Sequence, residues 1–179
     1  MSVYFIGCLH LGHENIAKMR GFESSAEHDR ELLAGINSVI SNRDKLFILG
    51  DLTMETAKHY HLLDQIKGVK HVIMGNHDRH IDVPRLLEHV DGVCGCLKYK
   101  NWMLSHVPIH PIEFDYRVKL NVHAHLHGQS TNDPRYYNVD AARLGYVPKS
   151  YDEIHFDNMK GTPCQPFGSD QHDGDNGIE

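Results

Sequence analysis

Side chains that can bind metal ions occur in a fixed order along the chain, each directly after a short apolar run. They lie in Cys8-x-His10, Gly50-Asp51, Gly75-Asn76-His77-Asp78, Ser105-His106 and His123-x-His125-x-His127. Ligands of mixed nitrogen and oxygen type suit divalent metal ions. If successive strands bring these ligands together, their order favours a site in which two metal ions act on one substrate in a hydrolytic reaction.

The apolar runs before these motifs predict buried strands with helices between them. We expect strands at Val3–Gly7, Lys45–Leu49 and Val69–Met74, a loop at Leu9–Glu23, and helices at Ala26–Ile40 and from Thr53 or Glu55 to Ile66. Alternating strands and helices predict an α/β layer with parallel pairing. The candidate ligands then converge, because the functional loops of such sheets follow the carboxyl ends of the strands.

The second half of the chain predicts shorter elements at closer spacing. They are a short helix at Val83–His89, a hairpin of Val93–Tyr99 and Trp102–Ser105, strands at Leu120–His123 and Tyr136–Val139, and a last helix or extended segment at Ser150–Phe156. Close spacing implies a second, more antiparallel sheet. Two sheets with helices outside them predict an α/β fold of the four-layer α/β/β/α sandwich type, built from two mixed sheets.

Length and composition predict one globular domain. The chain has 179 residues, 40% hydrophobic and 23% charged residues, and a net charge of −6. We assign residues 1–157 to the domain and residues 158–179, which are rich in Gly, Pro, Gln and Asp, to a flexible C-terminal tail. The negative charge argues against a broad nucleic-acid-binding face, which needs clustered basic residues. A nucleotide remains compatible, because bound cations can hold its phosphates.

The chain has no apolar run near the roughly 20 residues that a membrane span needs. Its N-terminus lacks a basic region and runs directly into the first expected strand, so we expect no signal peptide and a cytoplasmic location, in a bacterium or a phage-infected host cell. The cysteines at positions 8, 94, 96 and 164 predict no disulfide framework in that compartment. Cys94-Gly95-Cys96 could bind a soft metal, but packing within a strand is the favoured interpretation.

The ordered motifs resemble those of the calcineurin-like metallophosphoesterase superfamily, and its small bacterial and phage members in particular. The superfamily pattern is Asp-x-His, Gly-Asp, Gly-Asn-His-Asp or Glu, a lone His, and then Gly-His-x-His. The resemblance spans Val3–Ile154, and Gly75-Asn76-His77-Asp78 is its most specific part. Further segments similar to the small members are His10-x-x-His13-Glu14-Asn15-Ile16, Asn138-Val139-Asp140 and Asp152-Glu153-Ile154.

The resemblance implies a role for each matching residue. The metal ligands would be His10 and His127, with Cys8 at the usual Asp position, for the first ion, Asp51 as the bridge, and Asn76, His106 and His125 for the second ion. The catalytic residues would be His77 and Asp78, with Asp78 holding His77. The substrate-binding residues would be His13, Asn76, His77 and His110. His123 would support the ligands without binding metal.

The implied activity is hydrolysis of a phosphodiester or phosphomonoester by a hydroxide that two divalent metal ions, about 3.5–4 Å apart, share. Mn²⁺ is the ion expected to act in vitro, and Zn²⁺, Fe, Ni²⁺ and Mg²⁺ are further candidates. Analogy with small superfamily members favours a small or cyclic nucleotide as the substrate. His77 would protonate the leaving oxygen or stabilise charge on phosphorus.

Two positions depart from the superfamily pattern. Ala124 replaces a Gly, which is a mild change, and Cys8 replaces an Asp, which is not. Cys8 could bind as a thiolate and favour Zn²⁺ or iron, could stay unbound and weaken the first site, or could have disabled catalysis. The last case would leave a metal- or nucleotide-binding protein. A small nuclease is a further alternative, with a basic patch of Arg20, Arg79, Arg117, Lys119 and Arg135, and a homodimer is left open.

Overall fold

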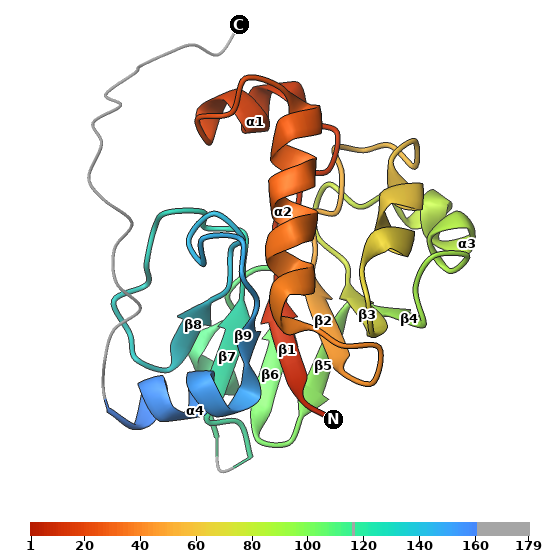
Figure 1. Ribbon diagram of the computed structural model, residues 1–179. Coiled ribbons are helices and arrows are strands. Elements are labelled where there is room, and N and C mark those ends of the chain that lie inside the picture. Colours follow the sequence, from red (N-terminus) through yellow and green to blue (C-terminus); the bar gives the residue numbers. More distant parts are fainter. Residues whose placement is uncertain (116, 161–179) are drawn as a thin grey trace, which may run out of the picture.

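The structure is a computed structural model that describes residues 1–115 and 117–160 (Figure 1). Its first sheet has the strand order β4-β3-β2-β1-β9. The strands are β1 (Val3–Ile6), β2 (Lys45–Leu49), β3 (Val69–Ile73), β4 (Gly92–Cys94) and β9 (Lys149–Ser150). Strands β1 to β4 pair in parallel, and β9 pairs antiparallel to β1. The expected parallel layer is therefore confirmed.

The second sheet has the order β5-β6-β7-β8. Its strands are β5 (Cys96–Tyr99), β6 (Trp102–Ser105), β7 (Leu120–His123) and β8 (Tyr136–Asn138). The hairpin of β5 and β6 is antiparallel as expected, but β6, β7 and β8 pair in parallel. The expectation of a more antiparallel sheet is thus wrong. The connections 106–119 and 124–135 are long enough for crossovers that return the chain to the same edge.

Most of the helical structure lies outside the first sheet. It comprises α1 (Glu14–Met19), α2 (Ser25–Val39), α3 (Val83–Leu86) and α4 (Tyr151–Met159), with the 3₁₀ helices η1 (Tyr60–Gln65), η2 (His80–Asp82) and η3 (Pro111–Glu113). Figure 1 shows α2 lying across this sheet. The apolar side of α2 packs through Leu32 and Ile36 in one buried cluster with Leu46 and Ile48 of β2. The spacing of these apolar residues therefore directs α2 onto the sheet.

Several elements differ from the expectations drawn from sequence. Helix α1 lies in the segment expected to be a loop, and Val93–Tyr99 is two strands that separate at Gly95. The helix expected from Thr53 or Glu55 is only η1. Its expected start is instead a turn, in which the Thr53 hydroxyl donates to Thr56 O at 2.6 Å and Glu55 has a φ of 51°. That φ is incompatible with a right-handed helix.

The two sheets pack on each other through a second apolar core. Phe5, Phe47 and Leu49 of the first sheet share a buried cluster with Trp102 and Leu104 of the second. The molecule is therefore a mixed α/β fold with two mixed sheets and helices on the first. Ile154 of α4 joins the same cluster, and α4 continues to Met159, past the expected domain boundary. Most of the expected tail, from residue 161, lies outside the described residues.

The sheets are also joined where the candidate ligands lie. After β8, Val139 donates its N–H to His123 O at 2.7 Å in the second sheet, and Gly7 of the first sheet donates to Val139 O at 2.8 Å. Asp140 forms a parallel bridge with Gly7. The carboxyl ends of β1 and β7 therefore meet at one edge. No helix within the described residues is long and apolar enough to cross a membrane.

Candidate metal centre

The candidate ligands stand in an unusual backbone conformation. Cys8, His10, Asp51, His125 and His127 all have φ values between 49° and 66°. Residues other than glycine seldom adopt this left-handed region, because their Cβ approaches the backbone too closely. Each of these residues follows the carboxyl end of β1, β2 or β7, where the chain turns out of its sheet. Strained conformations of this kind gather at functional sites, and five of the nine non-glycine residues with a positive φ among the described residues are candidate ligands.

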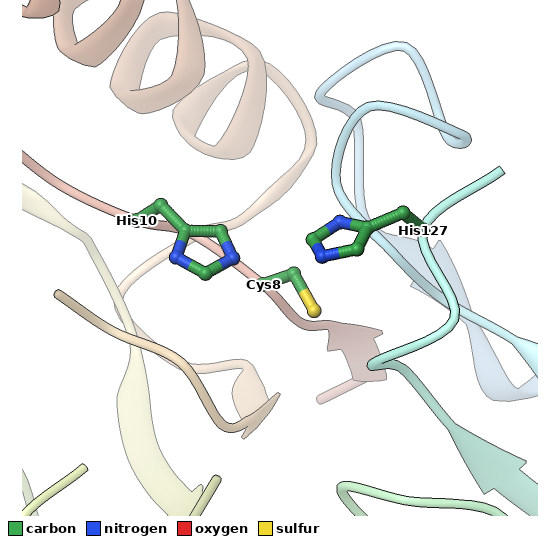
Figure 2. Close-up of side chains that lie close together, drawn as sticks. All are labelled: Cys8, His10 and His127. Carbon is green, nitrogen blue, oxygen red and sulfur yellow. The ribbon is translucent and has the colours of Figure 1, made fainter. Parts of the chain in front are cut away.

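One group of possible ligands consists of Cys8, His10 and His127, whose ligand atoms all lie within 4.8 Å of one another. Figure 2 shows the rings of His10 and His127 on either side of the Cys8 sulfur. Both ring nitrogens of His10 are buried and have no hydrogen-bond partner among the described residues. Burial is the main reason why the pKa of His10 falls to about 3, so the ring is neutral at neutral pH. A buried neutral imidazole without partners fits a metal ligand.

A second group surrounds the ring of His106. Its Nδ1 lies 2.8 Å from Leu49 O, to which it can donate, so Nε2 is the ring nitrogen that faces the other candidate ligands. That Nε2 lies 3.0 Å from Asn76 Oδ1, 3.2 Å from His125 Nδ1 and 3.3 Å from Asp51 Oδ2. Ligands that share one tetrahedral zinc ion with bonds near 2.1 Å lie about 3.4 Å apart. Each of the three neighbouring atoms thus lies at about this distance from His106 Nε2.

Asp51 lies between the two groups. Its Oδ2 is 3.8 Å from His10 Nε2 on one side and 3.3 Å from His106 Nε2 on the other, while its Oδ1 accepts the His77 N–H at 3.1 Å. Burial opposes ionisation of Asp51, but the hydrogen bond and charge of His106 outweigh it and lower its pKa. The same contact raises the pKa of His106 against the effect of burial. An ionised carboxylate in this position can bridge two cations.

Cys8 belongs to both groups, because its sulfur also lies within 4.8 Å of ligand atoms of Asp51 and His106. The side chain is completely buried, and its sulfur accepts the His125 N–H at 3.2 Å. Burial, followed by the charges of Asp140 and Asp51, raises the pKa of the thiol well above its usual value. The Cys8 side chain thus points into the centre, and it must lose a proton before it can bind metal as a thiolate.

Asp78 has partners other than the one expected from the motif. Its carboxylate accepts backbone N–H groups of Asp51 and Gly75 at 2.8 Å and of Leu52 at 2.9 Å. The side chain therefore ties together the loops that follow β2 and β3. The carboxylate beside the His77 ring is instead that of Glu55, with its Oε1 3.6 Å from Nδ1. Sequence reasoning missed Glu55, which carries no motif. The catalytic roles of His77 and Asp78 stay predictions.

The other predicted site residues lie at different distances from the centre. His13 caps α1, since its Nδ1 accepts the Ile16 N–H at 3.0 Å, and its ring centroid is 6.4 Å from that of His10. His110 caps η3, is exposed, and makes no described contact with a candidate ligand. His123 is buried, with Nδ1 2.8 Å from Ala124 O, and belongs to neither ligand group. Of the two predicted substrate-contacting histidines outside the motifs, only His13 adjoins the ligands.

Two charged residues that were not predicted as metal ligands, Asp140 and Arg20, adjoin the first group. Asp140 is 1% exposed, and its Oδ2 lies 3.2 Å from His127 Nδ1 and 3.6 Å from Arg20 Nη2. The same Arg20 nitrogen donates to Cys8 O at 2.8 Å. The carboxylate of Asp140 stays ionised despite burial, because His127 and Arg20 lower its pKa. The motif Asn138-Val139-Asp140 is the sequence signal that could have pointed to it.

A cavity of about 220 Å³ opens beside the first ligand group. It is lined by Ile16, Met19, Arg20, His127, Gly128, Asp140, Ala142 and Arg143. Helix α1 forms one wall, and the loops after β7 and β8 form the other. A larger cavity of about 550 Å³ lies between α2 and η1, and none of its lining residues is a candidate metal ligand. The smaller cavity adjoins the candidate ligands through His127.

Comparisons with known proteins give relatives without a stated activity, and no family model matches the chain. An uncharacterized protein of Methanocaldococcus jannaschii is 29% identical over 167 residues, which cover 86% of this chain and 89% of that protein. The Gene 66 proteins of Mycobacterium phages L5 and D29 are 34% and 32% identical over 43% and 48% of this chain, and the matches cover 40% and 46% of those proteins.

One solved structure is similar over most of the chain. The crystal structure of AQ665, a protein of unknown function from Aquifex aeolicus, matches with a TM-score of 0.68 and 24% sequence identity. The match covers 87% of this chain and 98% of that chain. This likeness shows that the two chains share a fold, and the arrangement of the candidate ligands remains the basis for any statement about function.

Proposed function

We propose that this protein is a metal-dependent phosphoesterase that hydrolyses a phosphodiester or a phosphomonoester. The observation that carries the proposal is the convergence of ligands from separate loops on Cys8 and Asp51. A carboxylate between two sets of nitrogen ligands supports two cations that share a ligand. This arrangement agrees with the resemblance of the motifs to the calcineurin-like metallophosphoesterases.

The donor set supports divalent transition metals. Cys8, His10 and His127 would hold one cation, Asn76, His106 and His125 the other, and Asp51 would bridge them. Two such cations supply a nucleophile at neutral pH and polarise the phosphoryl oxygens. We expect Mn²⁺ to support turnover in vitro, while a Cys8 thiolate would favour Zn²⁺ or iron over Mg²⁺, with Ni²⁺ as a further candidate.

His77 is the proposed acid of the reaction. Hydrolysis breaks the bond between phosphorus and the leaving oxygen, and that oxygen must gain a proton. The ring of His77 is 29% exposed and its centroid lies 6.1 Å from that of His10, so it borders both the centre and the solvent. Glu55 beside Nδ1 would orient the ring so that the other nitrogen faces the substrate. Asn76 and His13 would contact the substrate nearby, and His110 is proposed from the sequence alone.

The size of the adjoining cavity supports a small substrate. A volume of about 220 Å³ beside His127 suits the organic part of a small or cyclic nucleotide better than a polymer. The arginines that could form a nuclease patch are largely engaged elsewhere. Arg79 pairs with Asp82 at 2.7 Å, Arg135 pairs with Asp133 at 2.7 Å, and Arg20 is buried. These pairings disfavour a nuclease.

The detailed fold, the cellular location and the oligomeric state are also parts of the proposal. The four-layer α/β/β/α sandwich is supported by two sheets packed face to face with α2 outside the first. Its fourth layer stays a prediction, because Ile154 of α4 packs within the core between the sheets. A cytoplasmic location and a homodimer likewise stay predictions.

The proposal is tested by assaying the purified protein with p-nitrophenyl phosphate and bis(p-nitrophenyl) phosphate in the presence of Mn²⁺, Zn²⁺, Fe²⁺, Ni²⁺ or Mg²⁺. We expect metal-dependent release of nitrophenol. Substituting His77→Ala should lower turnover by about 100-fold or more, with metal content close to that of the wild type. Loss of metal from this variant would mean that His77 is a ligand and would contradict its assigned role.

A matched control is available for His77. His89 forms a similar pair with an acidic residue, since its Nδ1 lies 2.9 Å from Asp64 Oδ1, and it is distant in sequence from every ligand motif. His89→Ala should retain wild-type turnover. If metals bind but none of them supports turnover of either ester, the proposed activity is wrong.

The alternative is a protein that binds metal or nucleotide without catalysis, because Cys8 has replaced the usual Asp. Under this alternative, Cys8→Asp would create turnover that the wild type lacks. Under our proposal, the wild type is already active and Cys8→Asp mainly changes which metal supports the reaction. A filter-binding assay with single-stranded DNA or RNA at low salt tests the nuclease alternative. A nuclease would retain nucleic acid on the filter, and an esterase for small substrates would not.

A further inference from the structure

We propose that Asp140, held by Arg20, is a positioning residue that orients His127 toward the first cation. The inference rests on the metal centre of the proposed function. No motif assigns Asp140 a role, and its carboxylate belongs to neither ligand group. It therefore acts through a ligand and does not bind metal itself.

The geometry of the His127 ring is the first argument. Its Nδ1 lies 3.2 Å from Asp140 Oδ2, while the ring as a whole faces Cys8 and His10 (Figure 2). Because Nδ1 faces the carboxylate, Nε2 is the nitrogen left for a cation. Histidines that bind metals commonly donate their other N–H to a carboxylate, which fixes the ring and strengthens the ligand. His127 needs such a partner, since its side chain is 50% exposed.

The burial of Asp140 is the second argument. Its Oδ1 accepts the N–H groups of Ala142 and Arg143, but its Oδ2 is buried without a hydrogen bond among the described residues. A buried carboxylate oxygen is costly unless a charge or a donor faces it. His127 Nδ1 and Arg20 Nη2 are the groups that lie near this oxygen. A Nδ1–H held toward Oδ2 by metal binding at Nε2 would supply the missing donor.

Arg20 links this carboxylate to the cysteine. Its guanidinium donates to Cys8 O at 2.8 Å and to Leu9 O at 3.4 Å, and its Nη2 faces Asp140 at 3.6 Å. The bridge between Gly7 and Asp140 fixes the same two segments through their backbones. The turn that carries Cys8 and the carboxylate behind His127 are thus one connected unit.

The test begins with the wild-type protein loaded with zinc and uniformly labelled with ¹⁵N. Long-range ¹H–¹⁵N spectra should give His127 a protonated Nδ1 and a metal-bound Nε2. The opposite tautomer, or a His127 ring that does not bind zinc, would overturn the inference. Absence of any zinc binding would instead contradict the proposed function as a whole, so the two failures can be told apart.

The second part measures zinc affinity by competition with a chromophoric chelator. Asp140→Asn should weaken binding of one zinc ion by about 10–100-fold and leave the other near wild type. The control is Asp44→Asn, because Asp44 accepts N–H groups of Ser2 and Ser41 near the amino end of β2. That variant should bind both ions normally. Asp140→Asn with unchanged affinity for both ions would contradict the inference.

A double-mutant cycle separates positioning from a general effect of charge. If Asp140 acts through His127, then Asp140→Asn should cause no further loss of zinc affinity in a His127→Ala background. An undiminished loss in that background would mean that Asp140 acts through the electrostatic field alone and would overturn the positioning role. Thermal unfolding of each variant identifies any that fails to fold, and the tautomer measurement on the wild type then decides.

Discussion

The backbone is strained at five of the candidate metal ligands, and this strain lowers the free energy of unfolding. A residue other than glycine in a sparsely populated conformation costs on the order of 1–3 kcal/mol. Cys8, His10, Asp51, His125 and His127 all have a positive φ. At each of these positions the chain turns out of its sheet toward the centre. Five of the seven candidate ligands therefore stand where the backbone is strained.

Gly75 shows how little space surrounds the bridging carboxylate. A Cβ at this position would overlap Asp51 Oδ1 and lie 2.5 Å from the Asp51 backbone nitrogen. Gly75→Ala should therefore displace Asp51 and lower metal affinity at least tenfold, as measured by calorimetry. Gly95→Ala is the control, since a Cβ there meets no atom within 4 Å. Equal affinity in both variants would mean that Asp51 does not take part in binding.

A Cys8 thiolate bound to a metal ion should be detectable by absorption spectroscopy. Loading with Co²⁺ should give a near-ultraviolet band from charge transfer between thiolate and metal, which Cys8→Ser should abolish and Cys94→Ser should retain. Because the pKa of the Cys8 thiol is raised, binding should also release a proton, and metal affinity should increase with pH. Calorimetry in two buffers of different ionisation enthalpy measures this release. A band that survives in Cys8→Ser would exclude the thiolate ligand.

That the candidate ligands come together could be predicted from sequence, because each stands within four residues of the end of a strand. The contacts of Glu55 and Asp140 could not, since they join residues that are far apart in the chain. Glu55 meets His77, and Asp140 meets His127 and Arg20. Glu55 lies in no motif, and the segment Asn138-Val139-Asp140 specifies no partner for Asp140. The Asp78 carboxylate, which was expected to hold His77, accepts backbone N–H groups, and its motif does not specify these partners either.

The parallel crossover connections of the second sheet determine the edge of the sheet at which its candidate ligands lie. The connections after β6 and β7 begin with His106 and with His125 and His127, and each returns the chain to a parallel neighbour. All these ligands therefore leave the second sheet at one edge. Antiparallel pairing of β6 with β7, as the close spacing implied, would have sent His106 and His125 to opposite edges.

The short helix α4 depends on its cap. The Ser150 hydroxyl accepts the Glu153 N–H at 3.3 Å, and the Glu153 side chain accepts the Ser150 N–H at 2.8 Å. Ser150→Ala should lower the free energy of unfolding by about 1 kcal/mol, as measured by urea denaturation. Ser130→Ala, in an exposed loop, serves as the control. A loss no larger than that of the control would show that packing of Ile154 alone holds the helix.

Strands were easier to predict than helices, and particular residues explain the difference. The apolar runs of β1, β2 and β3 are buried in a parallel sheet, so their sequences are continuous and clear. Helix α1 has six residues and begins at His13, whose imidazole caps it in place of the usual hydroxyl or carboxylate. The segment from Thr53 has helical spacing of apolar residues, yet its turn is fixed by Glu55 and its contact with His77 O.

For the whole molecule, buried histidines predict a dependence of stability on pH. Burial is the main cause that lowers the pKa of His123 to about 4, against about 6.5 in an unfolded chain. Between these values the unfolded chain binds more protons than the folded one. The neutral His123 ring therefore makes its full contribution to the free energy of unfolding above pH 6.5. This contribution falls by up to about 1.4 kcal/mol per pH unit as the pH decreases from 6.5 toward 4.

This dependence is measured by urea unfolding of the chelator-treated protein between pH 7 and pH 4.5. His10, with its pKa lowered to about 3, acts in the same direction, while the raised pKa of His106 opposes both, and we expect a net loss of stability across this range. His123→Asn should reduce the slope, and the exposed His61→Asn controls for the substitution itself. A slope that is unchanged in His123→Asn would mean that the buried ring is not the titrating group.

The junction at Gly95 has a consequence for cooperativity. The chain passes from β4 in one sheet to β5 in the other through this single residue, and at the ligand edge Val139 hydrogen-bonds to both sheets. Unfolding of one sheet should therefore also disrupt the other sheet. Amide hydrogen exchange of β2 and β7 should report one common opening free energy, and local exchange should be confined to α1, the exposed loops and the surface turns.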